Sequence, residues 1–181
     1  MNLTLDILSK KEYELYEDTI SLKGTIEELT KLISNKGIFE KYAKIHKNYF
    51  ELFILTSDDS IKLEVLKRLV FLNWYSMVEP SFYTGVDNLD DETVLNSYIN
   101  LNDYINNNKL DSEFIWMLSY YASWDWTILT FSENKLDALT KFIKNVDNSI
   151  LHVPKHQLPK GIMDNRGQMG IYWISCLVES I

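Results

Sequence analysis

The stretch LKRLVFLNWYSMVEPSFYTG (residues 66–85) decides the expected fold. Apolar residues recur in it at helical spacing, and Glu79-Pro80 ends the helix because proline disfavours helical geometry in the residue before it. The stretch also holds Arg68, one of only two arginines beside sixteen lysines in the chain. Arginine presents a planar fork of five donors that lysine cannot copy, so Arg68 and Arg166 are the candidates for specific polar contacts.

Helix signals continue on both sides of this stretch. Thr25 and Glu28 form a predicted capping box, and Gly37 suits the end of that helix. Asp90 and Asp111 are predicted N-caps of two further helices. We therefore expect an all-α single domain over residues 1–181, with about seven helices in orthogonal or solenoid-like packing. Residues 1–23 are expected to form another helix or a loosely attached segment.

Composition narrows the classes of function. The chain has 181 residues, 46% of them hydrophobic, and a net charge of −8. This charge argues against nucleic-acid binding, which needs a basic face, and suits a basic protein partner. Cys176 is the only cysteine, so a reducing, cytoplasmic location is the simpler expectation. We find no signal peptide and no apolar run long enough for a membrane span, so a membrane partner is not expected.

A helical wheel places Arg68 in the middle of an apolar face. Treating residues 114–131 as one helix places Asp125, which lies between Trp124 and Trp126, on an apolar face as well. An unpaired charge there is costly, so we predict that Arg68 pairs with Asp125. Glu79 lies near a helix C-terminus, where its charge is unfavourable, and Arg166 is its predicted partner.

These pairs allow two interpretations. They are ion pairs that fix helix register, or, with Trp74 nearby, they line a ligand-binding cleft built from Arg68, Glu79, Asp125 and Arg166. The segment Arg166-Gly167-Gln168-Met169-Gly170 also has two interpretations. It is an anion site at a helix N-terminus, or a tight turn whose glycines permit close packing.

Metal and catalytic signatures are weak. His152 and His156 have ligand-like spacing, but Pro154 between them disfavours a regular helix, and zinc needs further ligands. His46 lies between Lys44 and Lys47 and is expected to be solvated. No catalytic motif accompanies Cys176. We therefore expect no metal, no cofactor and no catalytic residue.

Two segments, RLVFLNWYSMVEPSFYTGVDNLD (residues 68–90) and LDSEFIWMLSYYASWDW (residues 110–126), carry the pattern R-x-x-F-x-x-W-Y…E-P…T-G. This pattern, over the central third of the chain, resembles a family of small, helical, functionally uncharacterised bacterial proteins. The resemblance implies a cytoplasmic helical domain. It also implies that the characteristic core includes Arg68, Trp74, Glu79, Pro80 and Gly85.

Small size, acidity, aromatic richness and the lack of catalytic motifs favour a protein-interaction module, immunity- or antitoxin-like, over an enzyme. Two alternatives stay open. One is a small-ligand binder or enzyme with a pocket around Arg68, Glu79, Asp125 and Arg166. The other is a helical scaffold that pairs with a second copy of itself.

Overall fold

The computed structural model describes residues 3–147 and 161–176, and this part of the chain is helical throughout its regular structure, without a strand. The all-α class is therefore confirmed. The described residues form ten α-helices and one 3-10 turn, so the expected number of about seven is not confirmed, and the packing type stays a prediction. The helices are α1 (Leu5–Ile20), α2 (Ile26–Asn35), α3 (Ile38–Leu55), α4 (Asp59–Val78), α5 (Ser81–Thr84), α6 (Asp91–Asn106), α7 (Ser112–Tyr121), α8 (Trp126–Ser132), α9 (Asp137–Asn145) and α10 (Gly167–Cys176).

The predicted helix starts are confirmed by their caps. The Thr25 N–H donates to Glu28 Oε2 at 2.8 Å, which completes the capping box of α2. Asp90 accepts from the Thr93 N–H at 3.0 Å at the start of α6. Asp111 accepts from the Phe114 N–H at the start of α7. These local signals succeed because each cap depends on residues within one turn.

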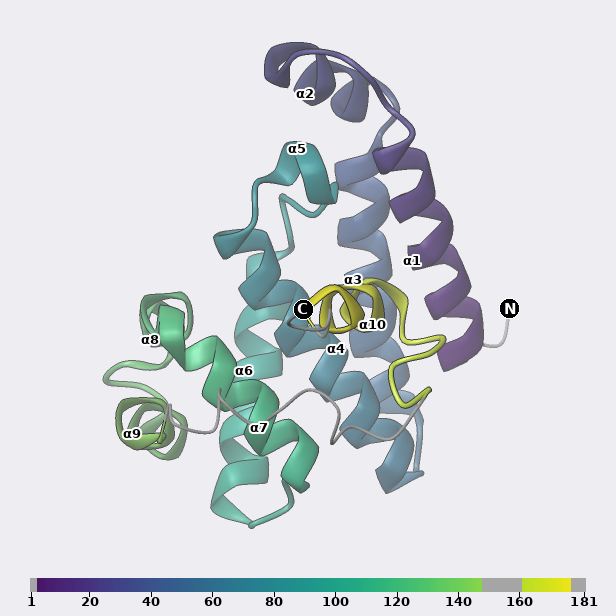
Figure 1. Ribbon diagram of the computed structural model, residues 1–181. Helices are drawn as coiled ribbons and strands as arrows, with labels where there is room; N and C mark the ends of the chain where they lie inside the picture. The colour runs from purple at the N-terminus through teal and green to yellow at the C-terminus, as the bar shows by residue number, and fades with distance from the viewer. Residues whose placement is uncertain (1–2, 148–160, 177–181) are drawn as a thin grey trace.

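Helix α4 is the central element of the molecule. It packs against α3, α6, α8 and α10, and Figure 1 shows α10 crossing in front of it. Its side chains are buried on every side from Val65 to Tyr75, including Lys67 and Arg68. The helical wheel assumed one buried and one solvated face, and that assumption is wrong for α4.

The segment 114–131 is not one helix, contrary to the expectation. Helix α7 ends at Tyr121, a 3-10 turn covers Ala122–Trp124, and α8 begins at Trp126. The turn changes the direction of the chain, so the helical wheel does not extend across it. As a result Asp125 is exposed to solvent.

An aromatic cluster joins α4, α7 and α10. Trp74 is fully buried and stacks on Tyr121 with ring centroids 4.7 Å apart. Trp116 of α7 and Trp173 of α10 lie 4.3 Å apart, measured between their ring centroids. Trp74, predicted as a ligand-binding residue, is therefore part of the core.

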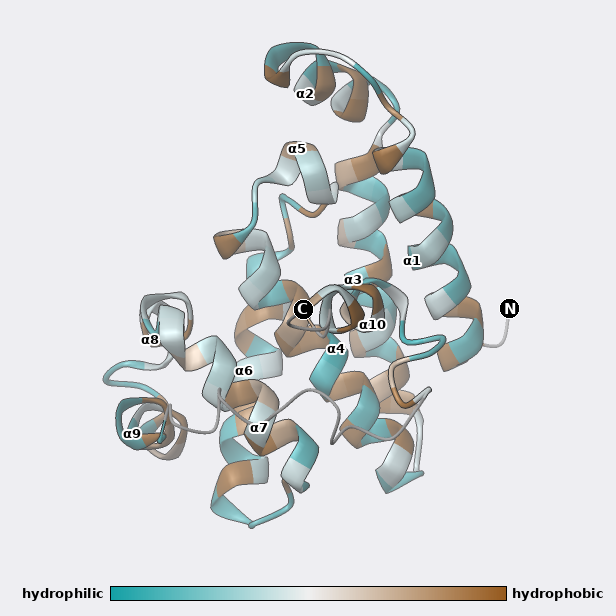
Figure 2. Ribbon diagram, in the orientation of Figure 1, coloured by the Kyte–Doolittle hydropathy of each residue, from teal (hydrophilic) through white to brown (hydrophobic). Residues whose placement is uncertain are grey.

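Figure 2 shows that α1 and α2 are mainly hydrophilic along their lengths, with isolated hydrophobic residues. Hydrophobic colour is denser in the middle of the molecule, where α4 and α10 meet. Within the described ranges, every helix is too short or too polar to cross a lipid bilayer.

Candidate binding site

Arg68 lies on α4 and is almost completely buried, with 4% of its surface exposed. Its Nε donates to Glu64 Oε1 at 2.9 Å, one helical turn earlier. Its Nη1 donates to the Tyr49 hydroxyl at 3.1 Å and to Ser9 Oγ. The predicted pair between Arg68 and Asp125 is wrong, because the break before α8 leaves Asp125 in solvent.

Arg166 precedes α10 and connects it to two other helices. Its Nε donates to Glu64 Oε1 at 2.9 Å, and its Nη1 donates to Glu113 Oε1 at 2.8 Å. The predicted partner, Glu79, is instead the C-cap residue of α4 and forms no ion pair with any residue in the described part of the chain. Glu64 and Arg68 lie at positions i and i+4 of the same helix, and this spacing indicates Glu64 as the partner of Arg68.

Lys67 completes the network. Its side chain is 5% exposed, and its Nζ donates to Asp111 Oδ2 at 2.6 Å and to Glu113 Oε2 at 2.5 Å. A helix buried on all sides requires acids for this charge too. Three cations and three carboxylates thus form one ion-pair cluster. Its members are Glu64, Lys67, Arg68, Asp111, Glu113 and Arg166.

The contacts of Glu113 and Arg166 favour the ionised forms of both groups. Burial opposes the charge on Glu113, but hydrogen bonds from Arg166 and Lys67 lower the pKa of this carboxyl below its ordinary value. Burial also opposes the charge on Arg166, but hydrogen bonds to Glu113 and Glu64 raise the pKa of the guanidinium. Satisfied pairs of this kind favour the first interpretation, in which the arginines fix the arrangement of helices.

A second polar contact lies beside the cluster and was missed by the sequence analysis. Glu12 of α1 is 1% exposed. Its Oε2 accepts from the Tyr49 hydroxyl at 2.7 Å, and its Oε1 accepts from the Gln168 N–H at 2.6 Å. The sequence did contain a signal, because Glu12 lies between Leu8 and Leu15 on the buried side of α1.

This contact decides between the two interpretations of residues 166–170. The first turn of α10 does bind an anion, but that anion is the chain's own Glu12 carboxylate. Gly167 has φ +58°, and a Cβ placed on it would lie 2.4 Å from Glu12 Oε2. A Cβ on Gly170 would lie 2.2 Å from the Met163 carbonyl oxygen. The close-packing interpretation of the two glycines is therefore confirmed.

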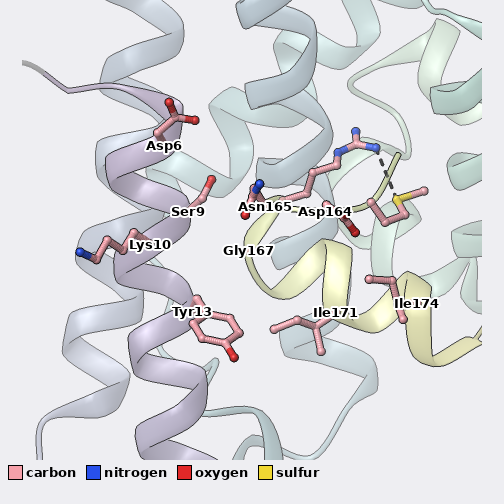
Figure 3. A pocket seen from close by; sticks show the side chains of 11 residues that line it. Asp6, Ser9, Lys10, Tyr13, Asp164, Asn165, Gly167, Ile171 and Ile174 are labelled. Carbon is pink, nitrogen blue, oxygen red and sulfur yellow. Dashed lines mark hydrogen bonds between the residues drawn. The ribbon is translucent and has the colours of Figure 1, made fainter. Parts of the chain in front are cut away.

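A groove of about 690 Å³ lies between α1 and the chain that leads into α10. Figure 3 shows Asp6, Ser9 and Tyr13 on the side of α1 that faces the opposite wall, whereas the Lys10 side chain extends away from that wall. That wall carries Asp164, Asn165, Ile171 and Ile174. We call this the α1–α10 groove.

A second hollow of about 500 Å³ continues from the α1–α10 groove toward the ion-pair cluster. The two hollows share Asp6, Asp164, Asn165 and Arg166. Carboxylates dominate the lining of the second hollow, where five acids surround two arginines. The acids are Asp6, Glu64, Asp111, Glu113 and Asp164.

No metal site is found among the residues that the structure describes. Residues 3–147 and 161–176 contain no group of three potential metal ligands, and His152 and His156 lie outside these ranges. His46 is fully buried, not solvated as expected. Burial lowers the pKa of His46 to about 4, so its imidazole is neutral at pH 7.

The predicted ligand-binding residues are therefore distributed over several environments. Arg68 and Arg166 belong to the ion-pair cluster, and both border the second hollow. Trp74 is in the core, while Glu79 and Asp125 take no part in the cluster. Comparisons of the chain with protein-family models, curated proteins and solved structures give no match.

Proposed function

We propose that this protein is an interaction module that binds a basic, partly apolar segment of another protein in the α1–α10 groove. The observation that carries the proposal is the combination, on one groove, of exposed apolar side chains with unpaired acids. An immunity- or antitoxin-like role in a bacterial cytoplasm is the form of this function that we favour, because the chain is small, acidic and rich in aromatic residues.

The apolar part of the groove is suited to protein contact. Tyr13 is 50% exposed and Ile174 is 49% exposed, on opposite sides of the groove. Aromatic residues that are partly exposed beside a hollow are frequent anchors in protein interfaces. A leucine-sized side chain of a partner between Tyr13 and Ile174 gains contact area on both sides.

The charged part of the groove determines the sign of the partner. Asp6 and Asp164 are exposed, and neither forms an ion pair within the part of the chain that the structure describes. Two cations, Lys10 and Arg166, also line the groove, but Arg166 is already paired with Glu64 and Glu113. The net charge of −8 adds long-range attraction for a basic partner. A lysine or arginine next to an apolar residue therefore complements the groove.

The other two classes of function have less support. An enzyme or ligand pocket around Arg68, Glu79, Asp125 and Arg166 needs these four groups to converge, and only Arg68 and Arg166 lie together. Self-association meets repulsion between two chains of net charge −8.

The proposal is tested with fluorescently labelled twelve-residue peptides that alternate lysine and leucine. Matched peptides carry glutamate in place of lysine. Anisotropy titrations of the full chain should show saturable binding of the lysine peptide alone. Tyr13→Ala should weaken it, and the double change Asp6→Asn with Asp164→Asn should weaken it by about threefold to tenfold. Higher salt should weaken it further.

Tyr83→Ala and Asp125→Asn are the matched controls, since both residues are exposed and neither lines the groove. Their affinity should equal that of the unchanged protein. Equal losses in the controls and the groove variants mean that the peptide binds by net charge alone. That result, or equal binding of the glutamate peptide, contradicts the proposal.

A further inference from the structure

Glu12 occupies a position of α1 where the spacing of the buried leucines predicts an apolar residue. Leucines at 8, 15 and 22 contact the core at heptad-like spacing, and positions 12 and 19 between them share the buried side. Thr19 at the second of these positions donates to its own helix, to the Leu15 carbonyl at 2.8 Å. Glu12 at the first has its side-chain hydrogen bonds outside α1, and so it joins Ser9, which accepts from Arg68, in connecting α1 to other elements through polar contacts.

The environment of Glu12 is built for a carboxylate. The Tyr49 hydroxyl donates to one carboxylate oxygen and the Gln168 N–H donates to the other. Arg68 donates to the same Tyr49 hydroxyl at 3.1 Å, which strengthens that hydroxyl as a donor and brings a positive charge close. Gly167 leaves the space that the carboxylate fills. We call Tyr49, Arg68, Gly167 and the Gln168 N–H the socket.

A carboxylate at position 12 costs more to bury than leucine does. A leucine at position 12 would always favour burial. A carboxylate loses its hydration in the socket, and burial accordingly raises the pKa of Glu12. When α1 leaves, the carboxylate regains its hydration, so the free energy that separates the docked and released states is reduced.

We propose that the socket is a carboxylate-binding site that Glu12 fills as an internal plug, and that α1 is a releasable helix whose departure opens the site to an external carboxylate. Free acetate or an acidic side chain is the class of ligand that the two donors and the nearby Arg68 charge select. Release of α1 also removes one wall of the α1–α10 groove, because α1 supplies Tyr13 and its neighbours. The occupancy of the socket and the integrity of the groove are thus coupled.

The test uses the full chain with Glu12→Ala, which removes a fragment equivalent to acetate. Amide hydrogen exchange is followed by NMR without ligand and during titration with sodium acetate. We expect exchange in α1 and at the Gln168 amide to rise by about tenfold or more, while α6 and α9 keep their protection. Acetate should restore protection along a saturation curve.

Acetamide, the neutral analogue of acetate, and sodium chloride at equal concentration serve as ligand controls and should not restore protection. Glu14→Ala is the matched variant, because Glu14 is an exposed acid on the same helix. Its exchange should be unchanged with or without acetate. Tyr49→Phe, in the background of Glu12→Ala, should weaken the effect of acetate because one of its donors is lost.

Each result decides the proposal. Equal rescue by acetate and acetamide, or a uniform rise of exchange over all helices, contradicts it and makes Glu12 a purely structural contact. If Glu12→Ala is unfolded in buffer, refolding by acetate alone supports the socket, and failure to refold overturns it. Because no partner peptide is used, failure here leaves the proposed function standing, and failure of the peptide test leaves the socket standing.

Discussion

At the scale of single residues, the two arginines differ from the lysines in what their geometry is used for. Arg68 and Arg166 donate through their Nε atoms to the same oxygen of Glu64, both at 2.9 Å. One carboxylate oxygen can accept both because each planar fork approaches from its own side. Lys67, with its compact ammonium group, is placed instead where two carboxylates converge on one point.

Replacing Arg68 by methionine keeps the bulk of the side chain and removes its charge. We expect the free energy of unfolding to fall by about 3 kcal/mol, because partly buried Glu64 loses a partner and the buried Tyr49 hydroxyl loses a donor. Urea denaturation measures the loss. Lys144→Met, which breaks an exposed pair with Glu133, should cost less than about 1 kcal/mol. A similar small loss for Arg68 means that its pair contributes no more than a surface pair.

His46 should make stability depend on acid pH. Burial lowers its pKa in the folded state to about 4, against an ordinary value of 6.5, and Asn73, Asp90 and the Leu69 backbone only partly oppose this. The folded protein therefore disfavours the protonated imidazole. The contribution of His46 to the free energy of unfolding is fully present above pH 6.5. It is lost as the pH falls toward 4.

The difference between the two pKa values of His46 corresponds to about 3 kcal/mol. Unfolding free energies measured between pH 7 and pH 4 should fall more steeply in the unchanged protein than in His46→Gln. The variant keeps every carboxylate, so the acids contribute equally to both curves. Parallel curves would show that His46 does not titrate between these pH values.

At the scale of elements, the residues at which helices begin could be predicted from the sequence. The neighbours that bury each helix could not. The Thr25 capping box and the Asp111 cap depend on neighbours within one turn, so the sequence determines them. The burial of α4 on all sides depends on the helices that surround it, which no local pattern of α4 reveals. The same limit explains the error at Asp125, where a short 3-10 turn interrupts an otherwise continuous apolar pattern.

The start of α10 offers a test at this scale. Gly161 and Gly167 both have positive φ, +80° and +58°, so alanine at either position costs about 1–2 kcal/mol in backbone strain. Gly167→Ala also displaces the Glu12 carboxylate, which adds about 1–3 kcal/mol. At Gly161 the nearest side chain, the exposed Asp164, can move away. Chemical denaturation of the two variants should therefore show a larger loss for Gly167→Ala.

At the scale of the whole molecule, the ion-pair cluster connects α4, α7 and the turn before α10. A double-mutant cycle with Arg166→Met and Glu113→Gln measures this connection. We expect a coupling energy of about 1–3 kcal/mol from urea denaturation, because both partners are largely buried. The exposed pair of Lys144 and Glu133 should give less than about 1 kcal/mol in the same cycle. Equal coupling energies would contradict a structural role of the cluster.

The sequence predicted the all-α class and specific polar contacts for both arginines. The partner that it predicted for each arginine was wrong. Glu64 was available from its spacing to Arg68, since it lies four residues earlier on the same helix. Glu113 was not, because it lies 53 positions before Arg166 and meets it only after the chain has folded. Glu12 and Gln168 are separated by 156 positions, so their contact depends entirely on tertiary structure.

The aromatic cluster gives the molecule an optical signature. Trp116 and Trp173 come from different helices, and their indoles, 4.3 Å apart between centroids, are close enough for their electronic transitions to interact. Trp74 receives excitation energy from Tyr121 beside it. The near-ultraviolet circular dichroism spectrum should thus contain a paired band that requires α7 and α10 to be in contact. Circular dichroism alone then reports whether α7 and α10 are assembled, without any label attached to the chain.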